Sequence, residues 1–68
     1  MDELSQNQKE IIEMLKENKN GIHQSIFIDK FNQSPVSVMY DLWYLMEKAE
    51  LIRSEGEDGD MTFFLDDS

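Results

Sequence analysis

The sequence predicts an α+β domain in which three helices are followed by a β-hairpin. Apolar residues recur at helical spacing as far as Ala49, and two short strand-like runs, "LIRS" and "MTFFL", come after it. The hexapeptide between these runs contains glycine and is typical of a turn. A chain of 68 residues suffices for a single domain, and we expect disordered ends at 1–3 and 66–68.

The first predicted helix covers residues 6–17. Ser5 and Gln8 have the spacing of a capping box, in which each side chain accepts a hydrogen bond from the other residue's backbone N–H. The helix ends in the polar "ENKNG", with Gly21 in the turn that follows. The apolar residues that fall on one side of this helix are Ile11, Ile12, Met14 and Leu15.

A second, brief helix is predicted over residues 24–32, after a short extended segment that begins at Ile22. Gln24 or Ser25 lies near its start. Its apolar residues are Ile26, Phe27 and Phe31.

The third predicted helix, over residues 35–49, has the clearest pattern. Ser34 is suited to cap it, and Pro35 occupies the first helical position, where a missing N–H is tolerated. Trp43 lies at the border of the apolar arc, and its large area favours a place in the core or at its edge. The inward arc contains Val38, Met39, Leu42, Leu45, Met46 and Ala49. The outward arc contains Ser37, Tyr40, Asp41, Tyr44, Glu47 and Lys48.

The hairpin strands are predicted near 51–54 and 61–65, paired antiparallel. A helix pair separated by a turn and followed at once by a terminal hairpin is the order of a winged helix. The sequence therefore predicts a winged helix over residues 1–68, with a three-helix helix-turn-helix core and a C-terminal two-stranded wing.

The charge of the chain disfavours nucleic acid as a ligand of the monomer. Fifteen acidic and six basic residues give a net charge of −9, and nine of the acids lie from Asp41 onward. A phosphate backbone is bound by Lys and Arg, so this field should repel it. The apolar runs are too short to span a bilayer, and the N-terminus lacks the regions of a signal peptide. We expect a soluble intracellular protein with no membrane partner.

Neither catalysis nor a cofactor is expected. His23 is the only histidine, the chain has no cysteine, and no serine motif is present that would form a nucleophilic pair with His23. A single histidine beside a helix start is usually a surface or capping residue. The acidic "EGEDGD" does not have the spacing of an EF-hand loop, so a solvated charge run that protects the hairpin edge is the better interpretation.

Four stretches form a recognisable set: "LSQNQKEIIEMLK" at residues 4–16, "GI" at 21–22, "PVS" at 35–37 with the "VMYDLWYL" that follows, and "SEGEDGDMTFF". Together they resemble the C-terminal winged-helix domain of the middle subunit of replication protein A. The resemblance covers nearly the whole chain, with a shortened loop before Gly21. The chain departs from the family at Ala49 and Glu50, where the family has Gly, and at Ile52 and Arg53.

The resemblance implies a docking module of a single-stranded DNA-binding complex rather than a DNA-binding domain. Its acidic hairpin and the neighbouring helix end would receive a basic amphipathic helix from DNA replication and repair proteins, which implies a nuclear location; otherwise we expect a cytoplasmic one. On physical grounds too, an acidic hairpin is suited to attract a Lys/Arg-rich partner and to orient it during encounter. Carried over by position, the candidate partner-binding residues are Glu47, Glu50, Arg53, Glu55, Glu57, Asp58, Asp60 and Phe63.

One alternative function stays open at this point. A small winged-helix transcriptional regulator could dimerise and assemble a basic, DNA-binding surface from Lys16, Lys19, Lys30 and Lys48. Tyr40 and Tyr44 suit either a protein interface or simple packing along the helix surface. The sequence leaves open the partner, the oligomeric state, and whether these residues form a whole protein or one domain of a longer chain.

Overall fold

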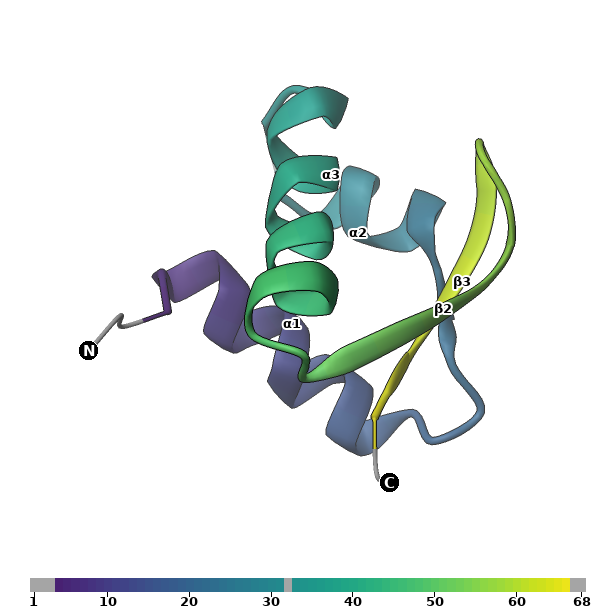
Figure 1. The fold of residues 1–68 in the computed structure, drawn as a ribbon. Coiled ribbons are helices and arrows are strands. Elements are labelled where there is room, and N and C mark those ends of the chain that lie inside the picture. Colours follow the sequence, from purple (N-terminus) through teal and green to yellow (C-terminus); the bar gives the residue numbers. More distant parts are fainter. Residues whose placement is uncertain (1–3, 32, 67–68) are drawn as a thin grey trace.

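The computed structural model describes residues 4–31 and 33–66. Within them it contains three α-helices, one π-helical turn and a three-stranded antiparallel sheet (Figure 1). The predicted α+β class is correct, and the arrangement is compatible with a winged-helix-like fold. The elements in chain order are α1 (Gln6–Glu17), β1 (Ile22–His23), α2 (Gln24–Lys30), α3 (Pro35–Trp43), η1 (Tyr44–Lys48), β2 (Ile52–Glu57) and β3 (Asp60–Leu65).

The predicted disordered ends fall mostly outside the described residues, which exclude 1–3 and 67–68. Of the residues in the predicted ends, the structure describes Asp66 alone. Its backbone N–H donates to the carbonyl oxygen of Leu51 at 3.0 Å, which extends the pairing of the hairpin ends by one residue.

The start of α1 has the predicted capping box. Gln8 N–H donates to Ser5 Oγ at 3.2 Å, and Ser5 N–H donates to Gln8 Oε1 at 3.0 Å. The Gln8 side chain is buried and also donates from Nε2 to Asp41 Oδ1 at 3.0 Å. Asp41, predicted on the outward arc, is therefore half-buried and fastens α3 to the start of α1.

Helix α2 is shorter than predicted, because Phe31 already has an extended backbone with φ −90° and ψ 108°. Position 32 lies outside the described residues. Phe27 and Phe31 are buried, as expected for residues four apart on one helix face, whereas Ile26 is 51% exposed. The inward face of α2 is thus narrower than the sequence suggests.

The third helix also ends earlier than predicted. It changes at Tyr44 into the π turn η1, in which Ala49 N–H donates to the carbonyl oxygen of Tyr44 at 3.0 Å. Leu51 N–H then donates to the carbonyl oxygen of Leu45 at 2.9 Å, and Glu50 between them has a positive φ of 55°. This wide turn leads the chain from the helix into the sheet.

The sheet has the strand order β1-β3-β2, so the predicted two-stranded wing has a third strand. Ile22 and His23 pair with Phe63 and Thr62, respectively. The hairpin strands are longer than predicted and pair as far as Glu57 opposite Asp60, leaving only residues 58–59 in the turn. Gly56 makes this close pairing possible: its φ is 107°, and a Cβ atom there would collide with the backbone oxygen of Asp60.

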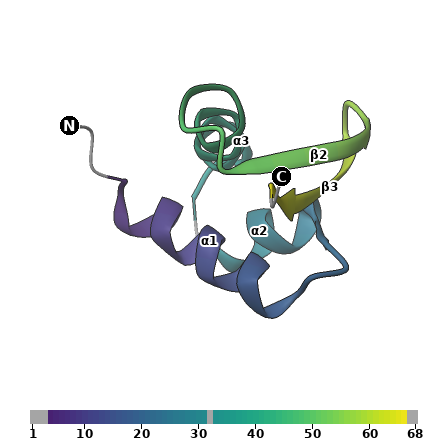
Figure 2. The ribbon, with the colours of Figure 1, turned by 60° about the horizontal axis from the view of Figure 1, so that its bottom comes forward.

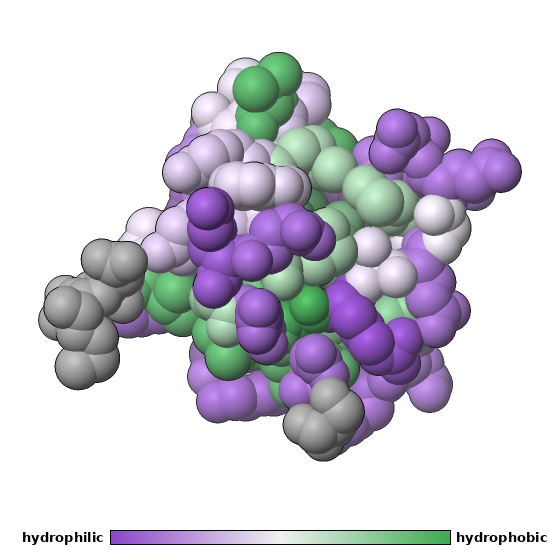
Figure 3. Space-filling model, in the orientation of Figure 1, coloured by the Kyte–Doolittle hydropathy of each residue, from purple (hydrophilic) through white to green (hydrophobic). Residues whose placement is uncertain are grey.

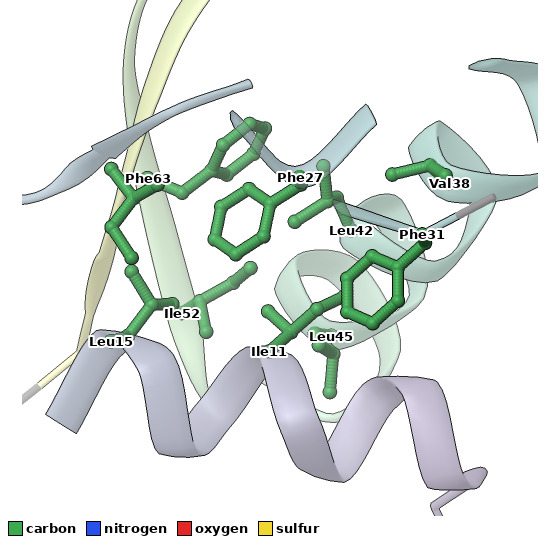
Figure 4. Close-up of a cluster of buried hydrophobic side chains, with 10 residues drawn as sticks. Ile11, Leu15, Phe27, Phe31, Val38, Leu42, Leu45, Ile52 and Phe63 are labelled. Atoms are coloured by element: carbon green, nitrogen blue, oxygen red, sulfur yellow. The ribbon is translucent and has the colours of Figure 1, made fainter. Parts of the chain in front are cut away.

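The core lies between the helices and the inner face of the sheet (Figure 4). Figure 2 looks almost along α3, with α1 running across beneath it and the hairpin extending to one side. The rings of Phe27 and Phe63 meet edge to face, with their centres 6.3 Å apart. The buried apolar residues are Ile11, Leu15, Ile22, Phe27, Phe31, Val38, Leu42, Leu45, Ile52 and Phe63.

Trp43 is not part of this core, and its predicted place there is wrong. It is 43% exposed because Val38 and Leu42 of α3 and Leu45 of η1 point inward, which leaves Trp43 on the other side. Among the described residues, no helix is long and apolar enough to cross a membrane.

Candidate functional site

The candidate site is the face of the hairpin that points away from the helices, here called the outer hairpin face. Along β2, buried Ile52 and half-buried Ser54 alternate with exposed Arg53, Glu55 and Glu57. Because paired residues in an antiparallel sheet share a face, the register assigns their partners on β3 to the same side. The outer hairpin face consists of Arg53, Glu55, Glu57, Asp60, Thr62 and Phe64.

An arginine stacked on an aromatic ring occupies the base of this face. Cζ of Arg53 lies 4.4 Å from the centre of the Phe64 ring, the residue with which it pairs across the strands. Its Nη1 donates to Glu55 Oε2 at 2.8 Å. The Phe64 ring lies over Gly21, where a Cβ atom would collide with it, and φ of Gly21 is 94°.

The charged side chains at the tip of the hairpin, residues 57–60, are all carboxylates. Glu57 lies directly opposite Asp60, with Asp58 in the turn beside them. Like charges opposite each other destabilise a strand pair. Within residues 4–31 and 33–66, Glu57 and Asp58 form no ion pair. Figure 3 shows hydrophilic residues gathered at this tip, at the upper right, whereas the surface over the upper part of α3 is of intermediate or apolar hydropathy.

Asp60 also connects the hairpin to the start of α2. Its Oδ1 lies 2.7 Å from His23 Nε2, and His23 Nδ1 accepts from the backbone N–H of Ser25 at 3.2 Å. The imidazole therefore caps α2, the structural role expected of a single histidine beside a helix start.

Sequence reasoning missed a contact on the other side of this imidazole. Ser25 Oγ lies 3.0 Å from His23 Nδ1, so a serine, a histidine and a carboxylate do form a chain of contacts. The spacing of two residues between His23 and Ser25 was the available signal. These three side chains are open to solvent, with the Asp60 side chain 84% exposed. His23 Nδ1 is shared between the hydroxyl and the backbone N–H of Ser25. General-base chemistry gains most in a site from which water is excluded, so this arrangement suits a cap better than a nucleophile.

The structure does not gather all the predicted site residues. Arg53, Glu55, Glu57, Asp58 and Asp60 lie together on the outer hairpin face and its turn. Glu47 and Glu50 are exposed but precede β2, whose six residues carry the chain about 20 Å to the tip. Phe63 points into the core and is 1% exposed, so it does not belong to the surface. Phe64, which sequence reasoning missed, is the aromatic residue of the outer face.

A second surface feature is a group of aromatic side chains on the solvent side of α3. The ring centres of Tyr40 and Trp43 are 5.9 Å apart, and those of Tyr40 and Tyr44 are 6.4 Å apart. Lys48 Nζ lies 5.7 Å from the centre of the Trp43 ring. Residues five apart point in different directions on an α-helix, and the wider π turn brings them closer to one line.

The described part of the chain, without position 32 and the ends, contains no group of three or more His, Asp or Glu side chains that could hold a metal ion. No protein-family model matches the chain, and neither a curated protein nor a solved structure is significantly similar to it.

Proposed function

We propose that this chain is a winged-helix domain without catalytic activity that docks a basic amphipathic helix of a partner protein on its outer hairpin face. The winged-helix assignment is supported by the order of the elements, with β1 between the first two helices and a hairpin after the third. The strand order β1-β3-β2, which joins the short first strand to the hairpin, fits the same assignment.

The observation that carries the proposal is the acidic tip, where Glu57 and Asp58 form no ion pair within the described residues. Glu57 and Asp60 repel each other across the strands, and Asp58 adds a third carboxylate beside them. This repulsion lowers the stability of the free hairpin. A lysine or arginine bound between these groups would relieve it, so a cationic ligand gains free energy here that a neutral one does not.

The base of the outer hairpin face supplies an apolar contact beside the charges. Phe64 is half-buried, and its ring lies against Gly21 and under the guanidinium of Arg53. A partner helix with one basic and one apolar side could place basic residues at the tip and apolar ones over this ring. In the free protein, Arg53 already occupies the position that such a basic residue would take, because its guanidinium donates a hydrogen bond to Glu55.

The class of partner comes from the resemblance to the winged-helix domain of replication protein A. On that basis we propose that the partners are DNA replication or repair proteins, met in the nucleus. DNA itself is a poorer candidate, because the lysines of the alternative reading are dispersed. Lys16 pairs with Glu13 on α1, and Lys48 lies over Trp43 on η1.

The proposal is tested by titrating the ¹⁵N-labelled domain with a Lys/Arg-rich amphipathic peptide and, separately, with a DNA duplex. With the peptide, we expect amide shifts on β2, β3 and the turn between them, and binding that weakens as salt rises, because screening shortens the reach of exposed charges to about 8 Å at physiological ionic strength. Shifts confined to residues 34–44 with DNA would replace the proposal with the regulator function.

Neutralising the tip should slow association with the peptide by roughly tenfold or more, because charges at the rim of an interface act mainly on the encounter rate. The variant is Glu55→Gln, Glu57→Gln and Asp58→Asn together, which retains Asp60 and its contact with His23. The matched control is Glu13→Gln, Glu17→Gln and Asp29→Asn, which changes the net charge equally on α1 and α2. Equal slowing of both variants in stopped-flow measurements would show that only net charge matters.

Arg53→Gln should change binding in the opposite direction. Removing the guanidinium releases Glu55 and uncovers the Phe64 ring, so the peptide should bind a few-fold more tightly at low salt. Isothermal titration calorimetry with the parent and variant domains measures this. Weaker binding by the variant would mean that Arg53 itself contacts the partner.

A further inference from the structure

The side of α3 that faces away from the core carries an exposed strip, here called the α3 strip, formed by Val36, Tyr40, Trp43 and Glu47. Val36 is 79% exposed, Tyr40 57% and Trp43 43%, and Glu47 on η1 is exposed as well. Large apolar and aromatic side chains grouped in this way mark an interaction surface more often than scattered ones do. The rings of Tyr40, Trp43 and Tyr44 contact one another, so they form one continuous aromatic group.

We propose that two copies of this chain associate through their α3 strips, with the helices antiparallel and Tyr40 of each copy packed against Trp43 of the other. The spacing of the strip is the same in both directions, since its residues follow one another at intervals of four, three and four. A two-fold axis that crosses α3 between residues 41 and 42 therefore exchanges Tyr40 with Trp43 and Val36 with Glu47. Such self-complementarity is what an interface between identical chains requires.

Charge favours a second copy over other occupants. Two chains of net charge −9 can approach closely only where few carboxylates lie, and between Val36 and Met46 the single carboxylate is that of Asp41. That group already accepts a hydrogen bond from Gln8. Residues 36–46 thus offer no free carboxylate to a basic peptide, and Glu47 at the end of the strip is its single exposed acidic group. The nearest cation is Lys48, which lies over the Trp43 ring. A single lysine provides little positive charge to bind a phosphate backbone.

The ends of the α3 strip are also complementary. In the antiparallel pair, Glu47 of each copy lies beside the first turn of the other copy's α3, which begins after the Ser34 cap and contains no acidic residue. The first turn of a helix carries partial positive charge on its N–H groups and stabilises a nearby carboxylate. The pair therefore gains two such contacts, one at each end.

The size of the strip predicts a weak dimer. A buried aromatic side chain removes roughly 150–250 Å² from water, so Tyr40 and Trp43 together leave on the order of 200 Å² per copy to be covered. Even with the flanking residues of both copies, the total stays below the roughly 1,200 Å² at which standard specific interfaces begin. We expect a dissociation constant between roughly 10 μM and 1 mM.

Sedimentation equilibrium of the whole chain over that concentration range tests the proposal. We expect a monomer–dimer equilibrium that strengthens with added salt, because salt screens the repulsion between the copies. Peptide docking on the outer hairpin face should weaken with salt, which keeps the two proposals separate. Trp43 is the single tryptophan, so its fluorescence reports on the interface, and its emission should shift to the red on dilution.

Two strip variants, Tyr40→Glu and Trp43→Glu, should each weaken the dimer at least roughly tenfold. The matched control is Ile26→Glu, which adds the same charge at a 51% exposed position on α2, outside the strip, and should leave the dimer unchanged. Circular dichroism verifies that each variant is folded. In a mixture of Tyr40→Glu and Trp43→Lys chains, position 40 of one chain meets position 43 of the other, so association should return.

Three results would overturn the proposal. The first is a chain that stays monomeric up to about 1 mM. The second is a dimer that both strip variants leave intact, or that Ile26→Glu dissociates equally, because either would locate the interface elsewhere. The third is a peptide or DNA duplex that shifts the α3 strip of a monomeric chain, which would assign the strip to that ligand.

Discussion

Phe63→Ala should leave the domain largely unfolded at room temperature. Phe63 is 1% exposed and packs edge to face on Phe27, and truncation of a buried Phe costs about 3–5 kcal/mol. A domain of this size holds about 3–5 kcal/mol in total, so little stability would remain. Urea titration followed by circular dichroism measures the loss.

The neighbouring residue provides the control for this prediction. Phe64 lies on the outer hairpin face and is only half-buried, so Phe64→Ala should stay folded and instead shorten the lifetime of the peptide complex. A Phe63→Ala chain with the urea midpoint of the parent would mean that the register of β3 is shifted by one residue. The pair of variants therefore separates loss of the fold from loss of the partner.

Leu42→Ala should destabilise the domain by about 2–5 kcal/mol, the usual cost of a cavity left by a buried leucine. Leu42 has no exposed surface and lies near the C-terminal end of α3, on the side that packs into the core. Tyr40→Ala, two residues earlier on the exposed side, should change the urea midpoint far less. Equal effects of the two changes would show that α3 is rotated relative to the core.

The helix starts and the inward face of α3 could be predicted from the sequence, because both depend on local chemistry. Ser5, Gln8 and Ser34 form their caps with neighbours three residues away. Val38, Leu42 and Leu45 are buried because helical spacing puts them on one side. These features are dictated by the chain itself and need no tertiary partner.

Trp43 shows where such reasoning fails. Its large apolar area argues for burial, yet the rotation of the helix is set by Val38 and Leu42 of α3 and Leu45 of η1, which leaves Trp43 outside. The neighbouring Tyr40 ring and the Lys48 ammonium group partly cover it instead. Residue size alone could not show which side of the helix the core would select.

The lengths of the strands were underestimated for a related reason. Glu55, Glu57 and Asp60 are exposed and acidic, so no apolar alternation marks them as strand residues. The burial of Phe63, which pairs with Ser54, sets the register of the two strands. The acidic residues pair because this register continues toward the turn, and the positive φ of Gly56 allows it to do so. The acidic residues of the site could be named from the sequence, but their common face could not.

The π turn at residues 44–48 has a consequence for how this chain is aligned with other proteins. It holds one residue more than an α-helical turn, so it acts as a single-residue insertion. Against a chain whose third helix ends in an ordinary α-helical turn, an alignment without a gap is one position out over the whole hairpin. In a strand, an offset of one exchanges the two faces, so Phe63 and Phe64 trade places. In such a comparison the gap belongs between Tyr44 and Lys48.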